Sequence, residues 1–306
     1  MHRTRARTQI PGASFVDPKV LARINNLELL ARTVVDGFIN GLHRSPYLGL
    51  SLDFAEHRGY MPGDDIRRID WRLFARTDRF YVKQFEADSN ANFSVLFDVS
   101  RSMSFGSQGV TKLDYGRYLA ASLTYFSHKQ RDRVGLITFD DDIVDHVPPS
   151  AKHLDVVLHT LDRMVPGRPG SLDAPLLKIT EHLRRRGILV VVSDFYEEPD
   201  IILEAVKRLR YRGHDVVVFH ILDPAEIEFP YDAASSFRDL ESGEQLPVVP
   251  DSIRVQYRAL IQEHIATLSR MCADHRIDYV MLDTSKPLDL ALFSYLSTRE
   301  RLSRVR

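Results

Sequence analysis

Short apolar runs alternate with amphipathic segments over the last two thirds of the chain. One run, 93–97, ends at Asp98, and another, 188–192, is followed by Ser193 and Asp194. Apolar runs of this length, bounded by polar residues, predict buried strands. Further strands are predicted at 134–139, 143–147, 216–222 and 279–282, and helices at 112–130, 153–164, 172–186, 200–211, 251–271 and 288–296. This alternation predicts an α/β fold, with a mainly parallel central sheet and helices on both faces.

The amino-terminal part of the chain follows a different pattern. Residues 1–14 are expected to form a flexible arm. Asp17 can then cap a helix with Pro18 at its first position, and apolar residues recur at steps of three and four as far as Phe38, as on one face of an amphipathic helix. We expect this helix to pack on its own domain; the alternative is a helix reserved for a partner.

These patterns predict a division of the chain into parts. Residues 15–90 should form a smaller α+β region made of the amino-terminal helix and short strands, and residues 91–306 the α/β domain. Within that domain, the segment near 226–249 is rich in turn residues and is expected to form a small β excursion.

Composition narrows the class of protein. Lys and Arg number 41 against 42 Asp and Glu, so the chain lacks the basic excess of a general nucleic-acid binder. Cys272 is the only cysteine, which excludes an intrachain disulfide and a multi-cysteine metal site. No apolar stretch approaches the roughly 18 residues of a membrane span. We therefore expect a cytoplasmic protein with no nucleic-acid partner and no membrane span.

Polar side chains follow the two central strands of the predicted sheet. Because the carboxyl ends of parallel strands meet at one edge, Asp98 and Asp194 can face one crevice. Ser100 and Ser102 follow Asp98, and Ser171, in a loop ahead of a helix, can supply another hydroxyl. Such hard oxygen donors suit a magnesium ion. The alternative is a strand end with Ser and Asp in its turn.

The pattern Asp98-x-Ser100-x-Ser102, with the Gly170-Ser171 loop and Ser193-Asp194, resembles the metal-ion-dependent adhesion site of von Willebrand factor type A domains. The upstream stretch 60–71, reading Tyr-Met-Pro-Gly-Asp-Asp-Ile-Arg-Arg-Ile-Asp-Trp, resembles the signature of the bacterial family called domain of unknown function 58. The resemblance implies a type A-like α/β domain behind a smaller amino-terminal region. It also implies a MoxR-type AAA+ ATPase as partner, with the chain acting as an adaptor or chaperone component.

One position departs from the adhesion-site pattern. Type A domains usually have threonine where this chain has Ser171, and serine lacks the methyl group that stiffens the rotamer. Asp173 is a nearby alternative ligand.

Two further acidic segments have structural interpretations. The three acids 140–142 predict a solvated hairpin turn. The mixed charges of the stretch 60–76 favour a charge-assisted hydrogen-bond network that holds a loop rigid or contacts a partner; an anion site, or carboxylates for metal chemistry, are the alternatives. The residues assigned to this network are Asp64, Asp65, Arg67, Asp70, Trp71 and Arg76.

The sequence favours a non-enzymatic protein-protein interaction module with a magnesium-dependent adhesion-type site. A metal-free scaffold of the same fold is one alternative. Another is a magnesium-dependent phosphohydrolase of the haloacid-dehalogenase type, which also begins with a strand-terminal aspartate. Those enzymes add a second carboxylate two residues later as general acid/base. Here that position is Ser100, which cannot readily exchange protons at neutral pH.

Overall fold

A computed structural model describes residues 17–24, 26–44, 56–60, 71–84, 91–183, 185–288 and 291–297. The predicted arm 1–14 lies outside the described residues. So does the segment 61–70, and with it four residues of the predicted charge network, Asp64, Asp65, Arg67 and Asp70.

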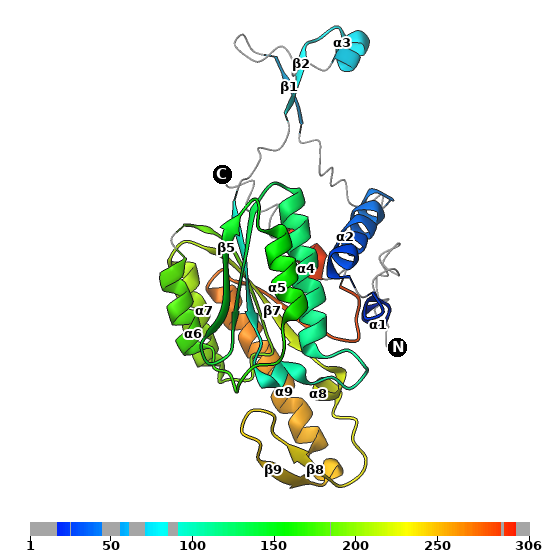
Figure 1. Cartoon of the computed structure of the whole chain (residues 1–306). Helices are drawn as coiled ribbons and strands as arrows, with labels where there is room; N and C mark the ends of the chain where they lie inside the picture. The colour runs from blue at the N-terminus through cyan, green and yellow to red at the C-terminus, as the bar shows by residue number, and fades with distance from the viewer. Residues whose placement is uncertain are drawn as a thin grey trace.

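A six-stranded sheet forms the centre of the structure, with the strand order β10-β7-β6-β3-β4-β5 (Figure 1). β3 pairs in parallel with both β4 and β6, and parallel pairing continues through β7 to β10, whereas β5 runs antiparallel to β4. From β3 the chain adds strands first on one side and then on the other, which is a doubly wound order. The strands are β3 Asn92–Asp98, β4 Arg133–Phe139, β5 Ile143–Ser150, β6 Gly187–Ser193, β7 Asp215–Leu222 and β10 Asp278–Asp283. The predicted α/β class with a mainly parallel sheet is confirmed.

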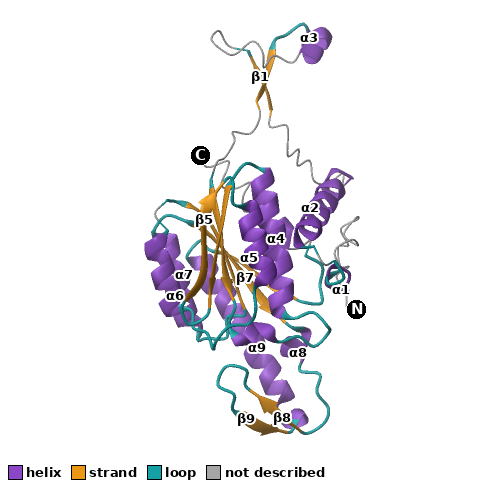
Figure 2. Ribbon diagram, viewed as in Figure 1, coloured by secondary structure: helices purple, strands orange, loops and turns teal. Residues whose placement is uncertain are grey.

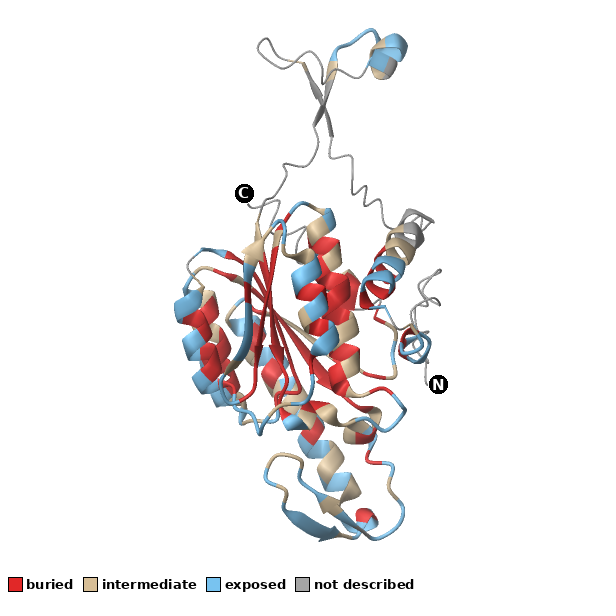
Figure 3. Cartoon of the chain, viewed as in Figure 1, coloured by how far each residue is buried: buried red, intermediate tan, exposed pale blue. Residues whose placement is uncertain are grey.

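The side chains of the central strands alternate between two apolar layers. Phe93, Val95 and Phe97 belong to one cluster of buried residues and Leu96 to the other, as the two-residue period of a strand requires. Helices cover both layers (Figure 2), and the central strands between them are buried, whereas the edge strand β5 is largely exposed (Figure 3). One face carries α4 Lys112–Lys129 and α5 Leu154–Arg163; the other carries α6 Asp173–His182, α7 Pro199–Tyr211 and α9 Pro250–Asp274. Burial on both faces explains why these strands are continuous apolar runs.

The amino-terminal helices, α1 Pro18–Leu21 and α2 Leu27–Arg44, pack on this domain. The Asp17 side chain accepts a hydrogen bond of 2.8 Å from the Lys19 N–H and so caps α1. Leu30 and Val34 of α2 are buried in the same cluster as α4. This helix packs within the chain, as expected, but it packs against α4 of the predicted 91–306 domain. A boundary at residues 90 and 91 therefore does not separate these helices from the core of the sheet domain.

Two small hairpins lie outside the central sheet. β1 Glu56–Gly59 pairs with β2 Tyr81–Gln84, and α3 Trp71–Thr77 lies between them in the chain. Trp71 is exposed and meets Phe80 edge to face, and Arg76 is exposed. β8 Ser235–Arg238 pairs with β9 Gln245–Val248 inside the predicted β excursion, after the short helix α8 Pro224–Glu228.

None of the helices in the described ranges is both long enough and apolar enough to cross a membrane.

A buried histidine generates a prediction about stability. His220 lies in β7, and its Nδ1 is 2.6 Å from the hydroxyl of Tyr279. Burial, with His264 nearby, lowers the pKa of His220 from 6.5 to about 3. The unfolded chain therefore binds this proton at a higher pH than the folded chain does. Below pH 6.5 the free energy of unfolding should fall by up to about 1.4 kcal/mol per pH unit because of this residue.

Urea unfolding between pH 7.5 and pH 5 checks this contribution. His220→Gln should show a flatter pH dependence than the wild type, while His159→Gln, at an exposed position of α5, should follow the wild-type curve. Equal slopes for all three proteins would contradict the prediction.

Candidate functional site

The site begins where β3 and β6 end side by side, at the point where the strand order reverses. Asp98 is the last residue of β3 and Ser193 the last of β6. The Asp98 Oδ1 accepts a hydrogen bond of 2.8 Å from the Ser100 N–H, and its Oδ2 accepts one of 2.6 Å from the Ser193 hydroxyl. In open α/β sheets this crevice is the usual ligand position.

The carboxyl group of Asp98 has a raised pKa, close to neutral pH. Burial, followed by the charge of Asp194, raises the pKa of Asp98 to about 7, against the hydrogen bonds from Ser193 and Ser100, which lower it. A cation placed beside the two carboxylates would oppose this shift, because it favours their charged forms. The electrostatics of the crevice therefore suit a positive charge.

The two predicted hydroxyl ligands lie together. Ser100 precedes the short 3₁₀ helix η3 Arg101–Ser104, and its Oγ is 3.1 Å from the Oγ of Ser102. Neighbouring ligands about 2.1 Å from one octahedral magnesium ion are separated by about 3 Å. The hydroxyl pair thus fits the geometry of a hard divalent cation.

The loop that follows α5 is fixed to this crevice through its backbone. The Gly167 N–H donates to the Val99 carbonyl at 2.6 Å, and the Arg101 N–H donates to the Arg168 carbonyl at 3.1 Å. The two loops are therefore joined at two points at the amino-terminal end of the η3 helix, which limits how far either can move alone.

Gly170, in the same loop, packs against Ser100. A Cβ built on Gly170 would lie 2.5 Å from the Cβ of Ser100, so the close approach requires glycine. Ser171 follows it at an exposed position. The Asp173 carboxylate does not lie with the hydroxyls of Ser100 and Ser102, which are called the serine cluster below. It pairs with Arg208 of α7 at 2.7 Å.

Asp140, the first of the three consecutive acids, supports the same loop. It is 6% exposed, its Oδ2 accepts the Arg168 N–H at 3.0 Å and its Oδ1 accepts the Asp142 N–H at 3.2 Å. The prediction of a solvated turn is wrong for this residue, although Asp141 and Asp142 are exposed. Backbone N–H groups compensate for the burial of its charge.

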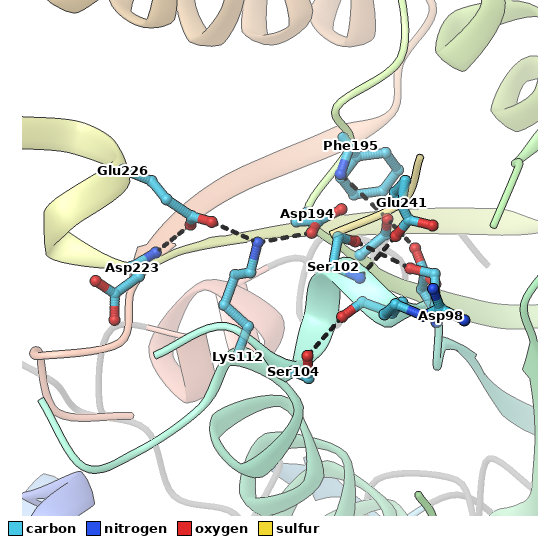
Figure 4. A network of polar contacts seen from close by, with 12 residues as sticks. Asp98, Ser102, Ser104, Lys112, Asp194, Phe195, Asp223, Glu226 and Glu241 are labelled. Carbon is cyan, nitrogen blue, oxygen red and sulfur yellow. Dashed lines mark hydrogen bonds and ion pairs between the residues drawn. The ribbon is translucent and has the colours of Figure 1, made fainter. Parts of the chain in front are cut away.

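Asp194 is paired with a lysine that the sequence did not point to. The Lys112 Nζ lies 2.7 Å from the Asp194 Oδ2 and 2.7 Å from the Glu226 Oε1, and the lysine side chain is 0% exposed (Figure 4). Burial disfavours the ammonium ion, but Asp194 and Glu226 outweigh it and raise the pKa of Lys112. The lysine is therefore charged, and it neutralises part of the negative charge of the Asp194 and Glu226 carboxylates.

Glu226, the second carboxylate paired with Lys112, is itself held in place by hydrogen bonds. Glu226 belongs to a capping box at the start of α8, where its Oε2 accepts the Asp223 N–H at 2.8 Å. Asp223 in turn accepts the Ser107 N–H at 2.9 Å. The ion pair thus connects the β6 end, the α4 start and the junction between β7 and α8.

Glu241 reaches the site from the β8–β9 hairpin. Its Oε1 accepts the Ser102 N–H at 2.6 Å (Figure 4), and its Oε2 accepts the Gly170 N–H at 3.0 Å. One carboxylate thereby joins the loop after β3 to the loop before α6. Sequence reasoning missed this residue because it lies 139 positions from Ser102, in a polar turn without a motif.

A family model described as "Protein of unknown function DUF58" matches residues 56–267. The chain belongs to this DUF58 family. The match spans β1 to most of α9, and so it includes the whole of the candidate site. The family predicted from the sequence is confirmed.

Relatives of this DUF58 chain include the uncharacterized protein Rv1480 of Mycobacterium tuberculosis and the uncharacterized protein Mb1516 of Mycobacterium bovis. Each is 28% identical over 293 residues, covering 93% of this chain and 91% of the relative.

Solved structures with a similar fold include the conserved hypothetical protein BatB from Bacteroides thetaiotaomicron, at 17% identity and a TM-score of 0.48, covering 69% of this chain and 99% of that one. The VWA domain of SpRpn10 is 13% identical with a TM-score of 0.37, covering 66% and 92%. Both scores are low, so the fold class of the DUF58 chain rests on its own sheet order.

The buried ion pair predicts a large effect on stability. Lys112→Met would leave Asp194 and Glu226 buried without their cation, and should lower the free energy of unfolding by about 3–5 kcal/mol. Adding Glu226→Gln should recover part of this loss, because it removes one of the two uncompensated charges. Denaturant unfolding measures both values.

Lys129→Met is the matched control. Lys129 lies in the last turn of the same helix, α4, and forms an exposed ion pair with Asp36 of α2. This variant should change the stability by less than about 1 kcal/mol. Similar losses for the two lysine variants would show that Lys112 is not an essential counter-charge.

Proposed function

We propose that this DUF58 chain is a non-enzymatic protein-protein interaction module that holds an acidic side chain of its partner at a magnesium-dependent adhesion-type site. The observation that supports it is the convergence of two loops at one crevice, with the Ser100 and Ser102 hydroxyls 3.1 Å apart beside buried Asp98. The proposed ligand set is Asp98, Ser100, Ser102, Ser171 and Asp194. A bound magnesium ion would supply an electrophilic position for a carboxylate.

The residue two positions after Asp98 argues against a catalytic role. A nucleophilic carboxylate of the haloacid-dehalogenase type needs a second carboxyl group as general acid/base. Ser100 stands at the position of that second group.

The proposed partner is a MoxR-type AAA+ ATPase, with the DUF58 chain as an adaptor or chaperone component in the cytoplasm. Support for this partner comes from the family resemblance, because proteins of this kind are commonly encoded with such ATPases. The proposal that the site binds an acidic side chain does not depend on which protein the partner is.

A metal-free scaffold is the second candidate function, and one contact favours it. The ammonium group of Lys112 already pairs with the Asp194 carboxylate at 2.7 Å. In this version Lys112 supplies the positive charge of the crevice, and the loops bind a partner through their backbone N–H groups.

Affinity capture with and without magnesium tests the proposal, with the captured proteins identified by mass spectrometry. The wild type should recover an AAA+ ATPase in magnesium, and calorimetry should detect magnesium binding. Asp98→Ala should lose both, because it removes a carboxylate from the ligand set. Asp173→Ala should retain both, since that acid pairs with Arg208 outside the serine cluster.

Three other results would change the conclusion. If Asp98→Ala kept magnesium binding and capture, the adhesion-type site would be excluded. Capture that persists without magnesium, in a wild type that binds none, would favour the metal-free scaffold. Asp98-dependent turnover in a phosphatase screen would favour the enzyme.

A further inference from the structure

The tip of the β8–β9 hairpin is built as a rigid turn. The Asp239 N–H donates to the Glu244 carbonyl and the Gly243 N–H to the Asp239 carbonyl, both at 2.9 Å. Gly243 has a φ of +77°, a conformation that favours glycine. The Asp239 carboxylate accepts the Glu241 N–H at 2.8 Å and the Ser242 hydroxyl at 2.6 Å. These hydrogen bonds therefore fix the backbone at Glu241, and its side chain extends from this turn to the crevice.

Glu241 binds as a ligand binds, through both oxygens and to two separate loops. The hydrogen bonds given to it come from the Ser102 N–H at 2.6 Å and the Gly170 N–H at 3.0 Å. A carboxylate held by backbone N–H groups makes charge-assisted hydrogen bonds, which are stronger than neutral ones. The two donors belong to the same loops that supply Ser102 and Ser171 to the proposed site.

Two backbone N–H groups are directed at one point, where they make a receptor for a carboxylate group. The crevice also contains the Asp98 and Asp194 carboxylates, and the ammonium of Lys112 is shared between Asp194 and Glu226.

We propose that Glu241 is an internal ligand of the candidate site: it occupies the position where an aspartate or glutamate of a partner binds, and the hairpin tip leaves when the partner enters. This proposal rests on the proposed function, because it names the chemistry and the competitor of the same site. An occupant tethered in the same chain acts at an effective concentration in the millimolar range. A free ligand therefore binds more weakly, in proportion to the fraction of open molecules.

The test uses the hairpin tip itself as a defined probe. A fluorescent peptide with the sequence of residues 237–246 is titrated into the full chain, with fluorescence anisotropy as the readout. Glu241→Ala should bind this peptide at least about tenfold more tightly than the wild type, because its site is no longer occupied in cis. A peptide with glutamine in place of its glutamate at 241 should lose the binding to Glu241→Ala.

Glu244→Ala is the matched control. Glu244 lies on the same tip at an exposed position, and its own hydrogen bonds use its backbone. This variant should bind the peptide as weakly as the wild type does. Equal binding by Glu241→Ala and the wild type, or no binding by either, overturns the proposal.

Hydrogen exchange separates a vacated site from a damaged one. The Ser102 and Gly170 amides should exchange slowly in the wild type and faster in Glu241→Ala, and added peptide should restore their protection. Glu241→Gln keeps the shape of the side chain and should show an intermediate rate. Protection that is already equal in Glu241→Ala and the wild type, without peptide, would contradict the internal-ligand role.

The capture assay distinguishes the failure of this inference from the failure of the proposed function. If Asp98→Ala abolishes ATPase capture while Glu241→Ala neither strengthens capture nor binds the peptide, the proposed function stands and the internal ligand fails. If the peptide selects Glu241→Ala while capture is indifferent to Asp98→Ala, the internal ligand stands and the proposed partner site fails.

Discussion

The ion pairs of the buried Lys112 ammonium group are the interaction on which the carboxylates at the carboxyl edge of the sheet depend. A charge without exposure to water is costly unless it is paired and hydrogen-bonded, and here Asp194 and Glu226 each lie 2.7 Å away. The rings of Phe105 and Tyr196 lie within 5.9 Å and 4.7 Å of the same nitrogen and add favourable contacts with a cation. This pairing connects α4, β6 and α8, and it allows several carboxylates to gather at one edge of the sheet.

Around that ion pair, one type of contact is used repeatedly: a carboxylate that accepts backbone N–H groups. Asp140 holds the loop after α5 in this way, and Asp98 holds the turn that leads to Ser100. Glu241 uses the same chemistry to join the two loops. Such contacts fix the loops around the crevice without long flexible cations. The internal ligand proposed for the site relies on the same type of contact.

Much of the site could be predicted from the sequence, because its principal residues are placed by local patterns. Asp98 and Asp194 follow apolar runs, and parallel strands bring such ends to the same edge. The errors have a common origin. The acids 140–142 have the local pattern of a solvated turn, yet Asp140 is buried by the neighbouring loop, whose N–H groups its carboxylate binds. Asp173 is close to Ser171 in the chain, but the turn of α6 directs its carboxylate to Arg208.

The sequence by itself determined the alternation of strands and helices, the mainly parallel sheet and the hydroxyls and carboxylates at its carboxyl edge, because hydrophobic periodicity acts over a few residues. Only the tertiary structure decided which charges meet. Lys112 is separated by 82 positions from Asp194 and by 114 from Glu226, and Glu241 is separated by 139 from Ser102. The energies of these contacts depend on distance, burial and the direction of N–H groups. None of these quantities exists until the chain has folded.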